Sequence, residues 1–477
     1  MATDDSYPVD PPGGDDDFDR VDTRAGRRTR GGERGRALQV RQEQVYVRRR
    51  RAVIAGLGAF LLLLVALVGF WVLDRPGSGD DAATAGAGDA VEAASGTGTA
   101  SEASADEDAD EGEKASEEDG PEATDPLWQK EPVAVERPSD TTAMEQVDYL
   151  TGNMTPKSVM ASGHGLMIAN NMMYQHTSTV YDATTREQVA VLDDSLDLAE
   201  FGVEGHPGIS KGSPVEAVWT DDGRYAYVSQ YTMYGENFGV EGFDACTKDS
   251  GVGDSMVYRF DAEELAWDQV IRVGAVPKYL EITPDQSTIL VSNWCDATLS
   301  VVDVEKGEEI KVIDVNASPR GIATMPDSNT AYAVAMYAEE LYEIDIEAGT
   351  SEVVMNTALR PRHLNISEDG RWLYLTASAG NAIVKIDTET MEVVDQVTPG
   401  LEPRSVTLSP DETALYVVNY NEASVSKIRT SDMELIDKQQ VDADPIGIDY
   451  DPVTNTVWVA CYNGAIYVFD DQSTPLP

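Results

Sequence analysis

The chain has 477 residues, with 85 Asp and Glu against 35 Lys and Arg, and a formal net charge of −50. This length accommodates one large domain with appendages, or two or three ordinary domains. Because nucleic acids are bound mainly through cations that neutralise their phosphates, this surplus of acid argues against a nucleic-acid partner.

The first predicted element is a membrane anchor. Residues 20–51 contain twelve arginines and three acids, and Ala52–Leu73 then gives 22 residues without a charge. As a helix this stretch would rise ~33 Å, enough to cross the hydrocarbon core of a bilayer. The flanking arginines place the N-terminus in the cytoplasm. We therefore predict a basic, disordered cytoplasmic tail over 1–51 and a transmembrane helix over 52–73.

A cleaved signal peptide is the alternative interpretation of the same segment. Signal peptides usually have a shorter apolar region, followed directly by small residues at the cleavage site. Here Asp74-Arg75-Pro76 follows the apolar stretch. The length and this flank favour an uncleaved signal-anchor, which makes the protein a single-pass cell-membrane protein.

Residues 74–143 form an acidic linker in this prediction. They contain 20 acidic and four basic residues, with many Ala, Gly, Ser and Thr. A segment of this composition cannot bury enough apolar surface to fold, so it is predicted to be disordered. It would hold the following domain clear of the membrane on the extracytoplasmic side.

The remaining residues, 144–477, are organised by prolines 42 residues apart, each opening an apolar run: Pro277, Pro319, Pro361, Pro403 and Pro445. Behind Pro403 come a first strand, a Ser-Pro-Asp turn, and further strands over 414–419, 424–428 and 435–441. Four short strands every 40 to 45 residues or so are typical of propeller blades.

Two earlier prolines, Pro156 and Pro214, open the same pattern at longer intervals of 58 and 63 residues, which makes seven blades. The seventh has no fourth strand of its own, whereas Glu145–Leu150 has the fourth-strand pattern without a blade. We predict that this segment completes the seventh blade and closes the ring, so that no edge strand stays free. The fold class is therefore all-β, a seven-bladed propeller of four-stranded blades, plus one transmembrane helix and disordered N-terminal regions.

The repeat itself has a known relative. The stretches "ALYVVNYNEASVSKI" (414–428) and "TILVSNWCDATLSVVDV" (288–304) resemble the YVTN repeat of the YncE-like family of bacterial extracytoplasmic propellers. The resemblance covers about 330 residues and implies the fold. It implies no particular activity, because propellers host lactonases, haem and quinone enzymes, and pure binding modules.

Two insertions interrupt the repeat, at about 193–213 and 232–254, and each contains the pentapeptide FGVEG, at 201–205 and 238–242. Both insertions are expected on one face of the propeller. We interpret the pentapeptides as a paired lip over the central opening. Alternatively, acidic glycine-rich segments resemble each other through composition alone.

The residue after the opening proline is basic in five of the seven blades: Lys157, Lys278, Arg320, Arg362 and Arg404. Residues 144–477 contain 55 acids and only 19 Lys and Arg, a net charge of −36. Five cations at one register, where the innermost strands begin, predict a cationic funnel that attracts anions. The alternative is that each cation pairs with an acid of a neighbouring blade.

Aromatic side chains are expected beside these cations. Tyr231, Trp294, Tyr420 and Tyr462 each stand 17 residues after an opening proline, in the loops between second and third strands. Aromatic faces beside cations suit a sugar, a planar ring or a peptide. They could equally pack against the next blade, as propeller side chains often do.

Catalytic and cofactor patterns are missing from the sequence. No histidine pair has zinc spacing, and there is no Cys-x-x-Cys-His, no glycine-rich phosphate loop and no Gly-x-Ser-x-Gly. We therefore predict no catalytic residue, no metal and no cofactor. Cys246 lies in the second insertion and Cys295 in a loop of the next blade, so a disulfide between them is expected, with Cys461 unpaired.

These patterns favour a membrane-anchored extracytoplasmic binding or scaffold module. Its partner would be an anionic cell-envelope polymer, a small molecule, or the carboxylates of a partner protein. One alternative is a lactonase-like or hydrolase-like enzyme, with His363 and the arginines handling a carboxylated small molecule. The other is a haem or quinone redox propeller, for which the sequence shows no ligand set.

The predicted topology leads to a direct test. Protease added to intact cells should remove the propeller and leave the tail 1–51, which the membrane protects. The measurement is immunoblotting with an epitope tag at each end of the chain. Isolation of a mature protein that begins beyond Leu73 would contradict the anchor.

Overall fold

The computed structural model describes residues 126–206, 208–231, 246–357 and 359–476. The predicted tail, transmembrane helix and most of the linker therefore lie outside the described residues, as does the second FGVEG copy. Within the described ranges, no helix has the length and apolarity needed to cross a membrane.

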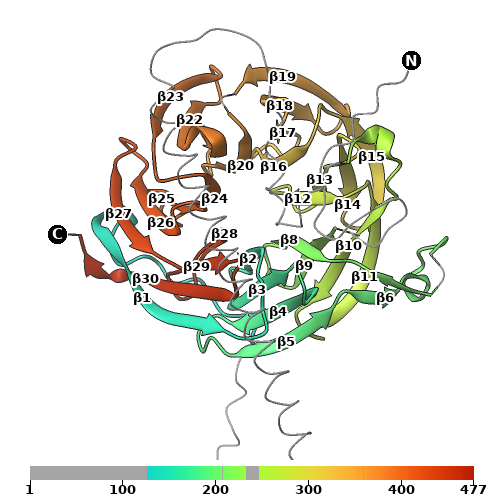
Figure 1. Ribbon diagram of the computed structural model, residues 1–477, viewed down its shortest axis with the longest axis horizontal. Helices are drawn as coiled ribbons and strands as arrows, with labels where there is room; N and C mark the ends of the chain where they lie inside the picture. Colours follow the sequence, from blue (N-terminus) through green and yellow to red (C-terminus); the bar gives the residue numbers. More distant parts are fainter. Residues whose placement is uncertain (1–125, 207, 232–245, 358, 477) are drawn as a thin grey trace, which may run out of the picture. The chain divides into compact units, whose positions relative to one another are not determined.

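Seven antiparallel sheets of four strands form a ring (Figure 1), which confirms the predicted all-β, seven-bladed propeller. In each blade the strand at or just after the opening proline is innermost (Figure 1). Neighbouring blades touch along these inner strands. We call the side of the ring with the first-to-second-strand turns the turn face, and the opposite side the loop face.

The first three blades consist, from the innermost strand outward, of β2 (Ser158–Ala161), β3 (Leu166–Asn171), β4 (Thr177–Asp182) and β5 (Gln188–Asp193); of β8 (Pro214–Trp219), β9 (Tyr225–Gln230), β10 (Ser255–Asp261) and β11 (Ala266–Val273); and of β12 (Pro277–Ile282), β13 (Thr288–Asn293), β14 (Thr298–Asp303) and β15 (Glu308–Asp314). The fourth, fifth and sixth blades consist of β16 (Pro319–Thr324), β17 (Thr330–Ala335), β18 (Glu340–Asp345) and β19 (Thr350–Asn356); of β20 (Pro361–Ile366), β21 (Trp372–Ala377), β22 (Ala382–Asp387) and β23 (Glu392–Val397); and of β24 (Pro403–Leu408), β25 (Ala414–Asn419), β26 (Ser424–Arg429) and β27 (Leu435–Gln440). The seventh blade consists of β28 (Pro445–Asp451), β29 (Thr456–Cys461), β30 (Ala465–Pro475) and β1 (Thr142–Thr151).

The ring closes as predicted. Strand β1 pairs antiparallel with β30, with Gln146 opposite Phe469 and Leu150 opposite Ile466. The fourth strand of the seventh blade therefore comes from a segment that precedes the first blade in sequence. In Figure 1 the teal β1 lies along the red β30, so this sheet joins the two ends of the propeller.

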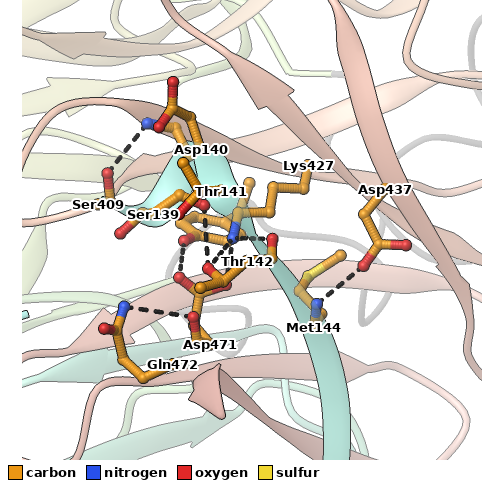
Figure 2. Close-up of polar contacts among 12 residues, drawn as sticks. Ser139, Asp140, Thr141, Thr142, Met144, Ser409, Lys427, Asp437, Asp471 and Gln472 are labelled. Atoms are coloured by element: carbon orange, nitrogen blue, oxygen red, sulfur yellow. Dashed lines mark hydrogen bonds and ion pairs between the residues drawn. The ribbon is translucent and has the colours of Figure 1, made fainter. Parts of the chain in front are cut away.

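A buried polar network fastens this closure to the sixth blade (Figure 2). The Nζ of Lys427, on β26, lies 2.6 Å from Oδ1 of Asp471, and both side chains are fully buried. The same Nζ donates hydrogen bonds to the carbonyl oxygen and to Oγ1 of Thr142, at 2.7 and 2.9 Å. Tyr416 donates its hydroxyl to the other carboxylate oxygen of Asp471. One lysine thus bonds to both strands that close the ring.

The asparagines of the repeat have a structural role. Nδ2 of Asn419, at the end of β25, donates to the hydroxyls of Ser424 and Ser426 on β26, at 3.1 and 2.9 Å. Asn293 makes the same pair of bonds in the third blade. The asparagine therefore ties the second strand of a blade to the third across the connecting loop.

The hydrophobic core lies between adjacent blades. Tyr416 and Val418 of β25, for example, pack in one cluster with Val457 and Val459 of β29. The second strands β25 and β29 are therefore buried on both faces, which explains why they read as nearly continuous apolar runs.

The first insertion forms a small rim element, with β6 (Ser195–Asp197), the 3-10 helix η2 (Leu198–Phe201) and β7 (Ile209–Lys211). Leu198 packs in a cluster with Tyr258 and Val270 of β10 and β11, and Phe201 lies against it. Figure 1 shows β6 at the periphery beside β11. The expected lip over the central opening is therefore wrong for this FGVEG copy, because the apolar residues beside it pack on outer strands.

The residues just before β1 run across the turn face. The backbone N–H groups of Lys130 and Val133 donate to the carbonyl oxygens of His164 and Pro452, at 3.0 and 2.8 Å. Near the 3-10 helix η1 (Ser139–Thr141), the N–H of Ser139 donates to Oδ2 of Asp411 at 2.8 Å. Contacts with the propeller thus begin upstream of the boundary predicted at 144, and the chain reaches the ring on its turn face.

The closure network predicts a large effect for one lysine. Replacing Lys427 with Met leaves the Asp471 carboxylate buried without its cation, which should cost about 3–5 kcal/mol of unfolding free energy. Urea unfolding followed by circular dichroism measures this. The control is Lys438→Met, which removes a half-exposed pair with Glu422 and should cost less than about 1 kcal/mol. Equal losses in the two variants would contradict the role of the network.

Candidate functional site

The five predicted cations meet at the loop-face end of the central channel. We call Lys157, Lys278, Arg320, Arg362 and Arg404 the cation cluster. All five are buried, with 1–5 % of their surface exposed. They surround a space of only about 20 Å³. That volume corresponds to roughly one water molecule, so the cluster is a compact group of charges rather than a wide funnel.

A backbone irregularity aims these side chains at the channel. The pairing of the first two strands shifts register directly after the opening proline, between Pro277 and Tyr279 in the third blade. The fourth, fifth and sixth blades repeat this shift. A β-bulge leaves the residue at this position out of the regular alternation of strand side chains and redirects it. Five blades have a basic residue after the opening proline, and in four of them this residue therefore stands at the bulge.

Two members of the cluster are neutralised by acids. Nζ of Lys157 lies 2.6 Å from Oε1 of Glu216 in the neighbouring blade. Nη2 of Arg404 lies 2.6 Å from Oε1 of Glu402, two residues before it. The alternative interpretation of the cations, pairing with an acid of a neighbouring blade, thus applies to Lys157, whereas Arg404 pairs with an acid of its own segment.

Three of the four predicted aromatic residues contact the cluster. The Nζ of Lys278 lies 4.0 Å from the centre of the Tyr231 ring and donates to its hydroxyl at 2.7 Å. The guanidinium of Arg320 lies 5.5 Å from the ring of Trp294. These contacts stabilise cations that would otherwise be costly to bury.

The other two predicted aromatics differ from each other. Tyr420 stacks under the guanidinium of Arg404, with 3.3 Å between the guanidinium carbon and the ring centre. The hydroxyl of Tyr462 instead donates to Sδ of Met172, at 3.6 Å, in the first blade. Tyr462 therefore packs against the neighbouring blade, which was the alternative interpretation of these aromatic residues.

His363 lies beside the cluster with a defined tautomer. Its Nδ1 accepts the backbone N–H of Val406 at 3.0 Å, so the proton of the neutral ring is on Nε2. Burial, together with the positive charges of Lys157, Arg320 and Arg362, lowers the pKa of His363 to about 3. A neutral ring whose free nitrogen is already protonated can donate a hydrogen bond but is a poor general base. This geometry counts against the hydrolase alternative.

Carboxyl groups line the channel on the side of the cluster nearer the turn face. Glu281 is the fourth residue after its opening proline, and its Oε2 lies 3.3 Å from the hydroxyl of Tyr279. Asp449 has the same position in the seventh blade and accepts the N–H of Ala161 and the hydroxyl of Thr407, at 2.8 and 3.0 Å. Burial raises the pKa of Glu281 to about 8 and that of Asp449 to about 6. The channel is thus cationic at one end and carboxylic at the other.

Sequence reasoning missed these two carboxyls. Both carboxyls stand at the fourth residue after an opening proline, and this common position could have identified them. In a strand the second and fourth residues after the proline alternate with residues that pack in the core, so their side chains face the channel. Tyr279 and Glu281 occupy these two positions in the third blade and are both partly exposed, whereas Leu280 between them is buried.

The cysteines connect the second insertion to the third blade. Cys246 and Cys295 form a disulfide with their Cα atoms 5.1 Å apart. Cys461 is buried in the core beside Tyr450, and burial raises the pKa of its thiol. No three His, Cys, Asp or Glu side chains of the described ranges are grouped so that they could hold a metal ion.

Comparison with known proteins gives a match to one family model and similarity to solved structures. The model of the choice-of-anchor I domain matches residues 244–399, about a third of the chain. No curated protein matches. Hydrazine synthase from Kuenenia stuttgartiensis is similar in structure, with a TM-score of 0.51 and 16 % identity over 68 % of this chain and 98 % of that chain. At this identity the likeness shows a shared fold alone.

The raised pKa of Glu281 predicts a pH-dependent stability. The folded protein holds a proton on Glu281 up to about pH 8, whereas the unfolded chain releases it near 4.5. Between these values the folded state binds more protons, so the free energy of unfolding should fall as pH rises. Because the side chain keeps some contact with channel water, we expect a fall of roughly 1–3 kcal/mol, to which Asp449 adds in the same direction.

Glu281→Gln should remove most of this dependence, since the amide does not titrate. Urea unfolding at several pH values between about 5 and 8 measures it. Glu264→Gln, at an exposed turn, serves as the control and should keep the slope of the unaltered protein. An identical slope in Glu281→Gln would show that this carboxyl is ionised in the folded state.

Proposed function

We propose that the propeller is an extracytoplasmic binding module that receives acidic groups of a ligand at the loop-face end of its channel. The observation that carries the proposal is the cation cluster, five buried cations around one small space in a domain with a net charge of −36. The ligand is an anionic envelope polymer or an acidic segment of a partner protein. The match to a choice-of-anchor domain supports a place at the cell surface, which agrees with the anchor predicted at 52–73.

The size of the space limits what can reach the cations. A volume of about 20 Å³ has no room for a sugar ring or a planar cofactor. The proposal therefore requires a single carboxylate or phosphate group that reaches the cluster from the loop face as the side chains around this small space move apart. Arginine can bind such a group through two parallel hydrogen bonds. An acidic polymer that presents one group at a time fits this better than a compact small molecule.

The enzymatic alternatives have no comparable support. The hydrolase alternative needs His363 as a base, and the bond from Val406 leaves this ring only as a donor. For the haem or quinone alternative, no contact among the described residues points to a site for either group.

Substitution of two arginines tests the proposal. Arg320→Gln with Arg404→Gln should weaken the binding of a fluorescent oligo-glutamate at least about tenfold and flatten the dependence of binding on salt, because two charges leave the cluster. Fluorescence anisotropy at several ionic strengths measures both. The control is Arg259→Gln, which removes a pair with Asp268 on the outer part of the second blade and should leave binding unchanged.

Two outcomes would overturn the proposal. One is that no acidic polymer or peptide binds to the unaltered protein. The other is that the double variant unfolds readily while the remaining folded fraction binds as before, in which case the cations are supports between blades. Unfolding free energies measured beside the anisotropy distinguish these cases from a loss of binding.

A further inference from the structure

A second pocket opens at the other end of the channel, on the turn face. We call it the turn-face pocket. Its volume is about 610 Å³, within the range of roughly 300–1,000 Å³ that is usual for small-molecule sites. Its walls come chiefly from the ends of the inner strands β2, β8 and β12 and from the turns that follow them. Pro132, from the segment that crosses the turn face before β1, forms part of one side.

The walls are largely apolar, and the polar atoms in them are mostly engaged. Met160, Trp219 and Ile282 line the pocket. The indole N–H of Trp219 donates to the carbonyl of Met160 at 3.2 Å, so the ring is held in place. Both ring nitrogens of His164 lie against backbone carbonyl oxygens, at 3.1 and 2.8 Å. These contacts leave a rigid wall with few polar atoms for an occupant.

The charged groups of the pocket are all acidic. Glu281 lines it where it meets the channel, and Asp221 lies in an exposed turn at its edge. Among the described residues that line it, none is Lys or Arg. An anion would therefore meet two carboxyl groups and no Lys or Arg here, whereas a cation with an apolar body would find both a charge partner and an apolar wall.

We propose that the turn-face pocket binds a primary ammonium compound with an aromatic or aliphatic body, whose nitrogen donates to Glu281 and whose body lies against Trp219 and Ile282. A primary ammonium fits better than a quaternary one because a carboxylate in a partly dry site needs charge-assisted hydrogen bonds. The acid surplus of the domain also draws cations toward it.

Proton release is a specific consequence of this arrangement. Burial, together with the nearby carboxyl of Asp449, raises the pKa of Glu281, whereas hydrogen bonds from the Tyr279 hydroxyl and the Ile282 N–H lower it; the net effect keeps Glu281 protonated near neutral pH in the empty pocket. An ammonium group beside it favours the carboxylate, so binding near pH 7 should release close to one proton. An amine that merely adheres to the acidic surface would meet carboxylates that are already ionised and would release none.

This site is independent of the proposed function. The anion-binding proposal concerns the loop-face end and the arginines of the cation cluster, whereas this pocket concerns the opposite end and Glu281. Each can fail without the other, because the two tests use different probes and different variants.

The test is calorimetric titration of the protein with benzylamine at about pH 7, in two buffers of different ionisation enthalpy. We expect saturable binding at one site and a buffer-dependent enthalpy that corresponds to release of about one proton. Benzyl alcohol and benzoate, of similar shape without the positive charge, should bind at least about tenfold more weakly. Glu281→Gln should weaken benzylamine about tenfold or more and abolish the proton release, whereas Glu264→Gln should change neither.

Three results would overturn the proposal: no saturable benzylamine binding, equal affinity for benzyl alcohol, or unchanged binding and proton release in Glu281→Gln. If Glu281→Gln does not fold, Asp221→Asn replaces it, since this exposed turn residue can change without loss of packing. Removing its charge from the pocket edge should weaken benzylamine by about two- to fivefold at low salt. Unchanged affinity in that variant would also overturn the proposal.

Discussion

The closure of the ring by β1 and β30 is the constraint on which the channel depends, and Lys427 makes polar contacts with both of these strands. The lysine is fully buried on the sixth blade, yet it bonds to Thr142 on β1 and to Asp471 on β30. A blade cannot bury both of its faces alone, so an open ring would expose apolar surface at two places and an unpaired edge at one. The buried charge of Lys427 has all of its partners only when both strands are in place. A partly paired arrangement would leave this charge or that of Asp471 without a partner, which disfavours it relative to the closed ring.

Closure in turn creates the channel and its polarity. The innermost strands of the seven blades bring equivalent positions together around the channel. A β-bulge directly after the opening proline aims the basic side chains at the loop-face end. The second and fourth residues after the proline face the same channel further toward the turn face, where Tyr279, Glu281 and Asp449 stand. The channel therefore passes from cationic side chains at the loop-face end to carboxyl groups nearer the turn face, because successive positions of the inner strands carry these two kinds of residue.

The interior of the channel keeps ionisation low where no partner is close. His363 stays neutral because burial and three nearby cations oppose its protonation, and Glu281 stays protonated because burial opposes its ionisation. Several of the channel cations have charged or aromatic partners: Lys157 has Glu216, Arg404 has Glu402, and Lys278 has the ring and hydroxyl of Tyr231. Both proposed ligands would act on this balance, the anion through the cations of the cluster and the ammonium compound by stabilising the carboxylate of Glu281.

The sequence by itself determined the blades, their number and the way the ring closes, because each follows from a pattern inside one repeat. The 42-residue spacing of the prolines and the unpaired strand pattern at Glu145–Leu150 needed no knowledge of distant contacts. The register of the cations was readable for the same reason. The burial of these cations could not be predicted from the sequence, because the width of the channel depends on how closely the inner strands of the seven blades approach one another. At Gly321 a Cβ would come within 2.8 Å of the backbone of His363, one blade away.

Only the tertiary structure decided where the first insertion and the carboxyls lie. The first FGVEG copy is at the rim because Leu198 and Phe201 find apolar partners on β10 and β11, a choice made by packing and not by the pentapeptide. Glu281 and Asp449 belong to blades far apart in sequence, and the ring brings them into one channel. Local periodicity specifies a blade, but the contents of a channel are set by seven blades at once, so its chemistry appears only when the ring has closed.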